Sequence, residues 1–347
     1  MPPIAHWIPL SWSFNYRRSS HCLSVTPNGR ALLYGGEYKS RDPSDGPLAP
    51  DSRVGAASLV IGDYFYIWGG RESIDISLLS DHQAGIWRSP IAVGTENSPT
   101  VWERINAINE EDAPQSRSFH AMTSYGNIIY VHAGYLENCR TGQLHAFDLT
   151  TKTWTPLATA PDPGRGGTAL VTVHLKGAPV LLRFAGFAGE ELDSLDVYDI
   201  HTDTWRTIVP EHDPRHGSPG ARSVYGFVPF VSPHFPRSLA LVYHGKRTPS
   251  AQVRIGALEF WDDVWMLEAG GDGEPELAWK KVYVPGNKVA PAPCGWFPSA
   301  SWVDGEETKV VLYGGMVSNN ERCGMLWLLE VINVDVDDPA GDNDNPV

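Results

Sequence analysis

The chain has 347 residues and a formal net charge of −14, the balance of 27 Lys and Arg against 41 Asp and Glu. With 42% hydrophobic and 20% charged residues it can bury a sizeable core, which excludes wholesale disorder. It lacks any Lys/Arg-rich run and any run of about 18 apolar residues, so we expect no nucleic acid partner, no anionic membrane partner and no membrane span. Its 34 Gly and 28 Pro favour many short strands joined by turns.

The N-terminal segment predicts one strand and no secretory signal. Residues 1–18 lack a basic stretch followed by an apolar core, whereas residues 6–10 (HWIPL) form a strand with a Trp and no partner nearby in the sequence. The cysteines are far apart and show no CxxC spacing, which favours reduced thiols and a cytoplasmic location. They are Cys22, Cys139, Cys294 and Cys323.

A glycine-ended strand recurs along the rest of the chain. A turn such as Asn28-Gly29 or Gly126-Asn127 comes before most of these strands, so each unit is predicted to begin with a β-hairpin. Glycine is expected there because the backbone turns sharply or approaches a neighbour that leaves no room for a Cβ. The six runs are 32–36, 66–70, 130–134, 182–186, 241–245 and 311–315.

Most units continue with a third strand and then a fourth strand that carries a Trp, as in 144–157 and 195–208. Four antiparallel strands repeated radially form a β-propeller blade. The pattern resembles the kelch repeat over nearly the whole chain, and the resemblance implies an all-β, six-bladed kelch-type β-propeller. The fourth-strand tryptophans are Trp102, Trp154, Trp205 and Trp279.

A single propeller is expected to occupy residues 1–332. Its first blade is expected to be irregular, because the segment after Gly36 is too short and polar for two good outer strands. The last unit shows no Trp strand after 325–331, so the N-terminal strand is expected to close the ring as the outer strand of the final blade. The acidic, apolar-poor tail 333–347 is expected to be disordered.

An arginine recurs near the start of the first strand in five units, and Cys294 takes its place in the sixth. Because first strands line the channel of a propeller, five guanidinium groups are predicted to converge near its axis. Guanidinium groups suit carboxylates, phenolates and polarised carbonyls, so a pocket for an anionic or oxygen-rich small molecule is predicted. The alternative is that each arginine bonds loops of the neighbouring blade. The five are Arg18, Arg53, Arg117, Arg165 and Arg222.

Two further sets of residues share a register. His21, His120 and Tyr225 stand three residues after the arginine, where they join the arginines as catalytic candidates or are simply core residues. The residues that directly follow the glycine signal begin the loops at one mouth of the channel. Together with Trp296 they are predicted to bind substrate: Glu37, Arg71, Tyr135, Phe187, Lys246 and Met316.

No metal or cofactor is expected. The sequence has no HExxH, no CxxC, no glycine-rich phosphate loop and no GxSxG nucleophile motif. Kelch proteins include nitrile-specifier proteins, whose iron motif places Glu, Asp and His at steps of four. The nearest frame here is Asp193, Val197 and His201, in which two of the three ligand types fail.

Two classes of function remain for such a chain. One is a protein-interaction scaffold, the commonest role of kelch propellers. The other is a cofactor-independent enzyme or small-molecule binder that uses the channel, which a chain with 13 Trp, 13 Tyr and 11 Phe suits somewhat better. A fold by itself does not decide between them.

Within the enzyme class, the chain resembles fungal hetero-Diels–Alderases of secondary metabolism in its size and in its lack of metal ligands. The resemblance implies cycloaddition of a tropolone o-quinone methide to a humulene-type sesquiterpene. Such a reaction needs two partners held face to face and donors to a carbonyl, which binding and arginine side chains can supply. The expected partners are therefore an oxygenated aromatic molecule and an apolar terpene.

Overall fold

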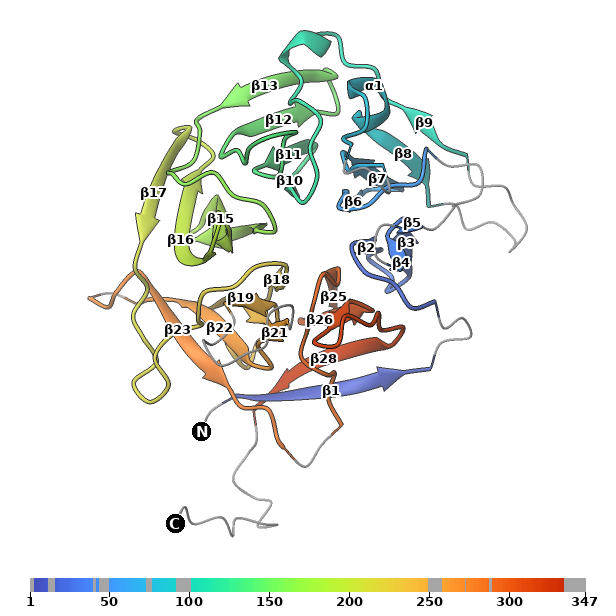
Figure 1. The fold of residues 1–347 in the computed structure, drawn as a ribbon. Coiled ribbons are helices and arrows are strands. Elements are labelled where there is room, and N and C mark those ends of the chain that lie inside the picture. The colour runs from blue at the N-terminus through green and yellow to red at the C-terminus, as the bar shows by residue number, and fades with distance from the viewer. Residues whose placement is uncertain are drawn as a thin grey trace.

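The structure is a computed structural model that describes residues 3–11, 16–39, 42–43, 50–72, 77–91, 101–248, 258–271, 273–286 and 289–333. Within these residues, antiparallel sheets are arranged as sectors around a central axis, so the expected all-β propeller is confirmed (Figure 1). No helix in the described part of the chain is long and apolar enough to cross a membrane. The acidic tail lies outside the described residues, apart from Asn333.

Three blades follow the chain in simple order from the axis outwards. The β6–β9 blade consists of β6 (Ala57–Ile61), β7 (Tyr64–Trp68), β8 (Trp87–Pro90) and β9 (Glu103–Arg104). The β10–β13 blade consists of β10 (Ala121–Tyr125), β11 (Ile128–His132), β12 (Leu144–Asp148) and β13 (Thr153–Leu157). The β14–β17 blade consists of β14 (Ala169–Leu175), β15 (Ala178–Phe187), β16 (Glu191–Asp199) and β17 (Thr204–Ile208).

The next two blades are not made of four consecutive strands. In one, the chain leaves the sheet between the second and third strands, and the other includes the N-terminal strand. The β18–β23 blade has β18 (Gly226–Pro229), β19 (Ser238–Tyr243), β22 (Val264–Ala269) and β23 (Leu277–Val282). The closing blade has β25 (Ser299–Asp304), β26 (Glu307–Tyr313), β28 (Leu326–Ile332) and β1 (Ile4–Leu10). The N-terminal strand β1 pairs with β28, with Trp7 opposite Leu329, so the expected closure of the ring is observed.

The expected number of blades is wrong. The described residues form five four-stranded blades, and the first repeat contributes only the two-stranded sheet of β2 (Cys22–Val25) and β3 (Ala31–Tyr34). This hairpin lies between the closing blade and the β6–β9 blade, because β2 contacts both β25 and β6. The polar segment that follows it supplies no outer strands among the residues described.

Short elements complete the described structure. Three further two-stranded sheets lie in the connections between strands, and two short helices lie in the region of the β6–β9 and β10–β13 blades (Figure 1). These elements are β4 (Glu37–Lys39) with β5 (Asp42–Pro43), β20 (Lys246–Arg247) with β21 (Glu259–Phe260), β24 (Cys294–Gly295) with β27 (Met316–Val317), α1 (Asp81–Ala84) and the 3-10 helix at Glu110–Asp112.

The recurrent glycines link each repeat to the next. The amide of the last glycine in each signal donates to a backbone carbonyl at the repeated Arg/Cys position of the following repeat, at 2.8–3.0 Å. A Cβ on Gly134 would lie 2.9 Å from the Cβ of His120, which no real side chain tolerates. The close approach predicted for these glycines is therefore confirmed at Gly134. The six bonds run from Gly36, Gly70, Gly134, Gly186, Gly245 and Gly315 to Arg53, Arg117, Arg165, Arg222, Cys294 and Arg18.

A second ring of backbone hydrogen bonds encircles the axis. One residue from each of the six repeats donates its N–H to the carbonyl of the equivalent residue in the preceding repeat, at 2.7–3.0 Å, and the sixth bond closes the circle. All six residues have φ between +49° and +66°. This axial ring consists of Ser20, Gly55, Phe119, Gly167, Val224 and Trp296.

The hydrophobic core is distributed between blades rather than gathered in one place. Between the β14–β17 and β18–β23 blades, the ring of Phe184 lies 5.1 Å from Trp279 and 5.8 Å from Tyr225. Fourth-strand tryptophans thus pack inwards against second strands, as the alternation of each strand requires. Because neighbouring blades share this packing, the position of each innermost strand at the axis is fixed.

Candidate functional site

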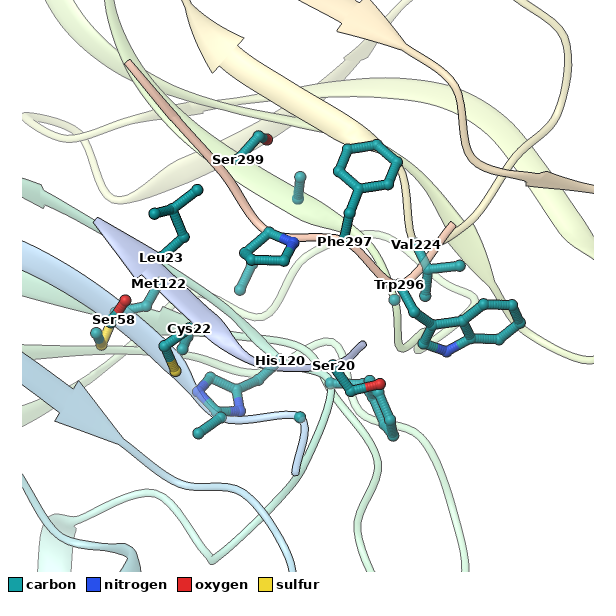
Figure 2. A pocket seen from close by; sticks show the side chains of 18 of the residues that line it. Ser20, Cys22, Leu23, Ser58, His120, Met122, Val224, Trp296, Phe297 and Ser299 are labelled. Carbon is teal, nitrogen blue, oxygen red and sulfur yellow. The ribbon is translucent and has the colours of Figure 1, made fainter. Parts of the chain in front are cut away.

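The axis contains a cavity of about 230 Å³ lined from all six repeats (Figure 2). Its wall comes from the beginnings of the innermost strands and from the axial ring. Apolar side chains such as Leu23, Met122 and Phe297 alternate around it with small polar ones such as Ser58 and Ser299. Among its lining residues only His21 and His120 carry a group that could be charged near neutral pH.

A second cavity, of about 270 Å³, lies at one mouth of the channel. We call it the rim cavity. It shares Phe119, Gly167, Val224 and Trp296 with the channel cavity, so the axial ring forms the boundary between the two. Left-handed φ is costly for residues with a Cβ, and most of all for a β-branched residue such as Val224. Strain of this kind persists where the surroundings enforce it, and it is common at binding sites.

The structure brings most of the predicted rim residues together. Arg71, Tyr135, Phe187 and Lys246 all line the rim cavity, as does Trp296. Their backbones occupy equivalent positions, since each of the first four forms a bridge with the residue directly after the repeated arginine. The structure thus brings five of the seven predicted residues to one cavity, and their role in binding stays a prediction.

Two members of that set do not line the rim cavity. Glu37 accepts a hydrogen bond from Arg322 Nη2 at 2.8 Å, and Arg322 Nε also donates to Ser19 Oγ at 3.2 Å. Met316 is buried and pairs with Gly295 in the β24–β27 sheet. These two positions lie on the side of the mouth formed by the first and last repeats, and their predicted role in binding also remains untested.

Cations lie against the aromatic rings of the rim cavity, and one of them, Arg140, is not itself among the lining residues. The guanidinium carbon of Arg140 lies 4.4 Å from the ring centre of Tyr135 and 4.8 Å from that of Phe187. Lys246 Nζ lies 5.0 Å from the Phe187 ring, and Arg71 lies 5.0 Å from the Phe119 ring. Cation–π contacts of this kind hold the charges against aromatic faces.

One carboxylate balances part of this charge. Glu191 is 8% exposed, pairs with Lys246 and accepts a hydrogen bond from Thr248 Oγ1 at 3.0 Å. Glu191 does not itself line the rim cavity, and no acidic residue among those described does so. The wall of the rim cavity is therefore cationic and aromatic in a chain whose net charge is −14.

The five repeated arginines lie behind the channel wall rather than on it. None of them lines the channel cavity or the rim cavity. In every case Nη1 donates, at 3.0–3.3 Å, to a carbonyl at the glycine signal of the same repeat, which orders that turn. Burial lowers the pKa of Arg117 and of Arg165 to about 10, so both remain charged at neutral pH. The acceptors of Arg18, Arg53, Arg117, Arg165 and Arg222 are Gly35, Gly69, Ala133, Ala185 and His244.

His21, His120 and Tyr225 line the channel cavity and also pack against the preceding repeat. The His120 ring meets Trp68 edge-on at 4.7 Å, and the Tyr225 hydroxyl donates to the carbonyl of Phe184. Burial lowers the pKa of His120 to about 3, and nearby Arg117 adds to the shift, while backbone groups of Arg117 and Trp68 oppose it. Neutral imidazole is therefore the form present at pH 7, and a catalytic role for these residues stays a prediction.

Sequence reasoning missed Phe119, which lines the rim cavity, and Arg140, which contacts two of its aromatic rings. Phe119 belongs to the axial ring, and the signal that could have found it is its position one residue before His120 in a repeated register. Arg140 comes from the connection between β11 and β12, where nothing in the sequence repeats. No group of three or more His, Cys, Asp or Glu is suitably placed for a metal ion within the described residues.

The radial blades, the pairing of the N-terminal strand with the last blade and the axial cavities define a β-propeller. Residues 43–228 match the family described as the KLHDC2/KLHL20/DRC7 Kelch-repeats domain, which is more than half of the chain. The chain therefore belongs to the kelch-repeat family.

Of two curated relatives, one is named for its kelch domain and the other for an enzymatic activity. Kelch domain-containing protein 3 of Rattus norvegicus is 23% identical over 295 residues, which is 80% of this chain and 64% of that protein. This chain thus covers slightly less than two thirds of that relative's length. N-(sulfonatooxy)prop-2-enimidothioate sulfolyase of Thlaspi arvense is 22% identical over 357 residues, which covers 90% of this chain and 92% of the enzyme.

A solved structure described as the structure of YjhT superimposes with a TM-score of 0.59 at 15% identity. The match covers 91% of this chain and 98% of that one, and it supports the fold alone. The resemblance to fungal hetero-Diels–Alderases has no support from these comparisons.

Proposed function

We propose that this protein is a small-molecule enzyme whose rim cavity binds an organic anion with a flat, unsaturated body. The observation that carries the proposal is the lining of this cavity, in which Arg71 lies against the Phe119 ring and Lys246 against the Phe187 ring without an acidic residue among the lining residues. Cationic side chains recognise sulfonate, sulfate and carboxylate groups, and aromatic walls bind flat apolar bodies.

The sulfolyase relative supports an enzyme that acts on an anion. The name of that enzyme specifies a substrate with an anionic sulfonatooxy group, and the similarity extends over 90% of this chain. The name of Kelch domain-containing protein 3 specifies no activity, and that relative matches a smaller share of the chain. A non-enzymatic interaction scaffold remains the alternative, in which the same cationic mouth would bind an acidic partner.

Size argues against the particular cycloaddition that the sequence suggested. The rim cavity measures about 270 Å³ within the described residues. Pockets that enclose one drug-sized ligand measure roughly 300–1,000 Å³. A hetero-Diels–Alderase that uses the channel would have to hold a tropolone quinone methide and a sesquiterpene together in this cavity or in the adjoining channel cavity of about 230 Å³. One anion of modest size fits these dimensions better than two reactants.

Binding of naphthalene-2-sulfonate, measured by titration calorimetry against neutral naphthalene-2-sulfonamide, tests the proposal. We expect the anion to bind at least tenfold more tightly, and Arg71→Met and Lys246→Met each to weaken it several-fold. Arg237→Met is the matched control, because this side chain is half exposed and pairs with Glu274 away from the channel. Equal binding of both probes, or no effect of either rim substitution, would contradict an anion site.

A product assay tests the choice of reaction. A tropolone o-quinone methide generated in buffer with humulene should give the same adduct mixture with and without protein. A faster reaction that yields one stereoisomer would restore the cycloaddition.

A further inference from the structure

A larger cavity lies away from the axis, at the seam between the β18–β23 blade and the closing blade. We call it the seam cavity. Its volume of about 610 Å³ lies within the roughly 300–1,000 Å³ typical of small-molecule sites. Trp7 of β1 and Val282 of β23, which are both buried, give it an apolar surface. It shares no lining residue with the channel cavity or the rim cavity.

The polar part of this cavity centres on Lys281 and Asp263. Asp263 accepts hydrogen bonds from Arg222 at 2.8 and 2.9 Å and from Trp265 Nε1 at 2.8 Å. Lys281 Nζ lies 3.8 Å from the same carboxylate, so two cations share one anion. Arg215 and Asp262, two exposed residues that also line the cavity, have opposite charges. Because both carboxylate oxygens of Asp263 already accept from Arg222, an anionic group beside Lys281 would be stabilised.

A buried acceptor stands in the same cavity wall. His244 is 2% exposed, and its Nδ1 lies 3.1 Å from the carbonyl oxygen of Trp261. Because a carbonyl can only accept, Nδ1 carries the proton, and Nε2 of the neutral ring is left as an acceptor. Burial lowers the pKa of His244 to about 4, which keeps the ring neutral at pH 7. Nε2 has no hydrogen-bond partner in the described structure.

The Lys281 ammonium and the His244 Nε2 acceptor would be matched by a ligand that carries both an anionic group and a hydrogen-bond donor. We infer that the seam cavity binds a small hydroxy acid, whose carboxylate pairs with the Lys281 ammonium and whose hydroxyl donates to His244 Nε2. The apolar part of the ligand would lie against Trp7 and Val282. Buried acceptors without donors are unfavourable, so a hydroxyl that satisfies Nε2 should add affinity over the same acid without it.

Matched pairs of acids test this inference. The probes are mandelate with phenylacetate and lactate with propionate, titrated into the full chain and followed by calorimetry. We expect the hydroxy acid of each pair to bind at least tenfold more tightly than its partner. Lys281→Met should weaken both members of a pair tenfold or more. His244→Phe should abolish the preference for the hydroxyl while leaving phenylacetate binding unchanged.

Lys280→Met is the control, since Lys280 is the next residue on β23 and lies 3.8 Å from Glu268, outside the cavity lining. Absence of saturable binding for all four acids would overturn the inference, as would equal binding within each pair or equal effects of the two lysine substitutions. If His244→Phe fails to fold, the pairwise preference of the unmodified protein and the Lys281→Met result still decide. Failure here leaves the rim proposal untouched, because naphthalene-2-sulfonate binding is measured at a separate cavity.

Discussion

Arg222 and Asp263 form a doubly hydrogen-bonded ion pair inside the β18–β23 blade, with Nη1–Oδ1 and Nη2–Oδ2 distances of 2.8 and 2.9 Å. The Arg222 side chain is fully buried, and that of Asp263 is 8% exposed. The same guanidinium donates to the carbonyls of Gly220 and His244. All three of its nitrogens thus donate hydrogen bonds, and Nη1 holds the glycine turn of this repeat through the His244 carbonyl.

Arg222→Ala should destabilise the fold. Removing one partner of a buried pair leaves an uncompensated charge and typically costs about 3–5 kcal/mol. Urea unfolding followed by Trp fluorescence at pH 7 measures the loss. The double variant Arg222→Met with Asp263→Leu should recover much of it, because it removes both buried charges and leaves only the Lys281 ammonium, which is 25% exposed, without its carboxylate. A folded, fully stable Arg222→Ala protein would show that this arginine does not hold the turn.

The same pair predicts a dependence of stability on pH. Burial alone would raise the pKa of Asp263, but Arg222 outweighs it and the net pKa lies below its usual value near 4. A carboxyl group with a lowered pKa in the folded state stabilises the protein above the unfolded-state pKa. That contribution should disappear as the pH falls below about 4. The free energy of unfolding should therefore depend less on pH in Asp263→Asn than in the unmodified protein between pH 5 and 3.

His120→Phe should flatten the pH dependence at milder acidity. The pKa of His120 is lowered to about 3 in the folded state, chiefly by burial, whereas an unfolded histidine titrates near 6.5. Stability supplied by the neutral ring is complete above the unfolded pKa and decreases as the pH falls towards 3. The decrease for one such group is about 1.4 kcal/mol per pH unit. Urea titrations at pH 7, 6 and 5 should show a smaller decrease in the variant, and identical slopes would contradict this.

Gly134→Ala should be far more damaging than Gly126→Ala. Both glycines have positive φ, at +106° and +56°, but a Cβ on Gly134 would lie 2.9 Å from His120 and 3.0 Å from the Ser118 carbonyl oxygen. A Cβ on Gly126 would have nothing within 4 Å. Gly126→Ala therefore carries only the backbone cost of about 1–2 kcal/mol. Thermal unfolding compares the two, and equal shifts would show that the inter-repeat contact can relax.

Trp7→Ala should weaken the closure of the ring. Trp7 is 4% exposed, and its ring lies 5.7 Å from Tyr243 and 5.6 Å from His244 of the neighbouring blade. Truncation of a buried Trp costs about 3–5 kcal/mol. His6→Ala on the same strand is the control, because His6 is only partly buried. Unfolding in urea measures both, and similar losses would mean that the register of β1, rather than this contact, closes the ring.

The order of strands was readable from the sequence, because hairpins and glycine turns are local. Gly126-Asn127 joins β10 to β11 as the pattern predicts. The strand around Trp7 has no partner nearby in the sequence, and the last repeat lacks a fourth strand, so its pairing with β28 could be predicted. The number of blades was not readable. The six glycine signals give the number of inner hairpins, one for each repeat. Whether a repeat also has two outer strands depends on the segment that follows its hairpin, and the first repeat shows only β2 and β3.

The sequence by itself determined the repeat, and with it the kelch resemblance and the equivalence of the rim positions. Repetition fixes which residues are equivalent, since every repeat folds by the same local rules. Only the tertiary structure decided where those side chains point. Arg117 and Phe119 are two residues apart, yet the first is held behind the wall by backbone carbonyls and the second borders both axial cavities. Arg140 and the seam between β1 and β23 lie outside the repeat, and contacts between distant segments brought them to their sites.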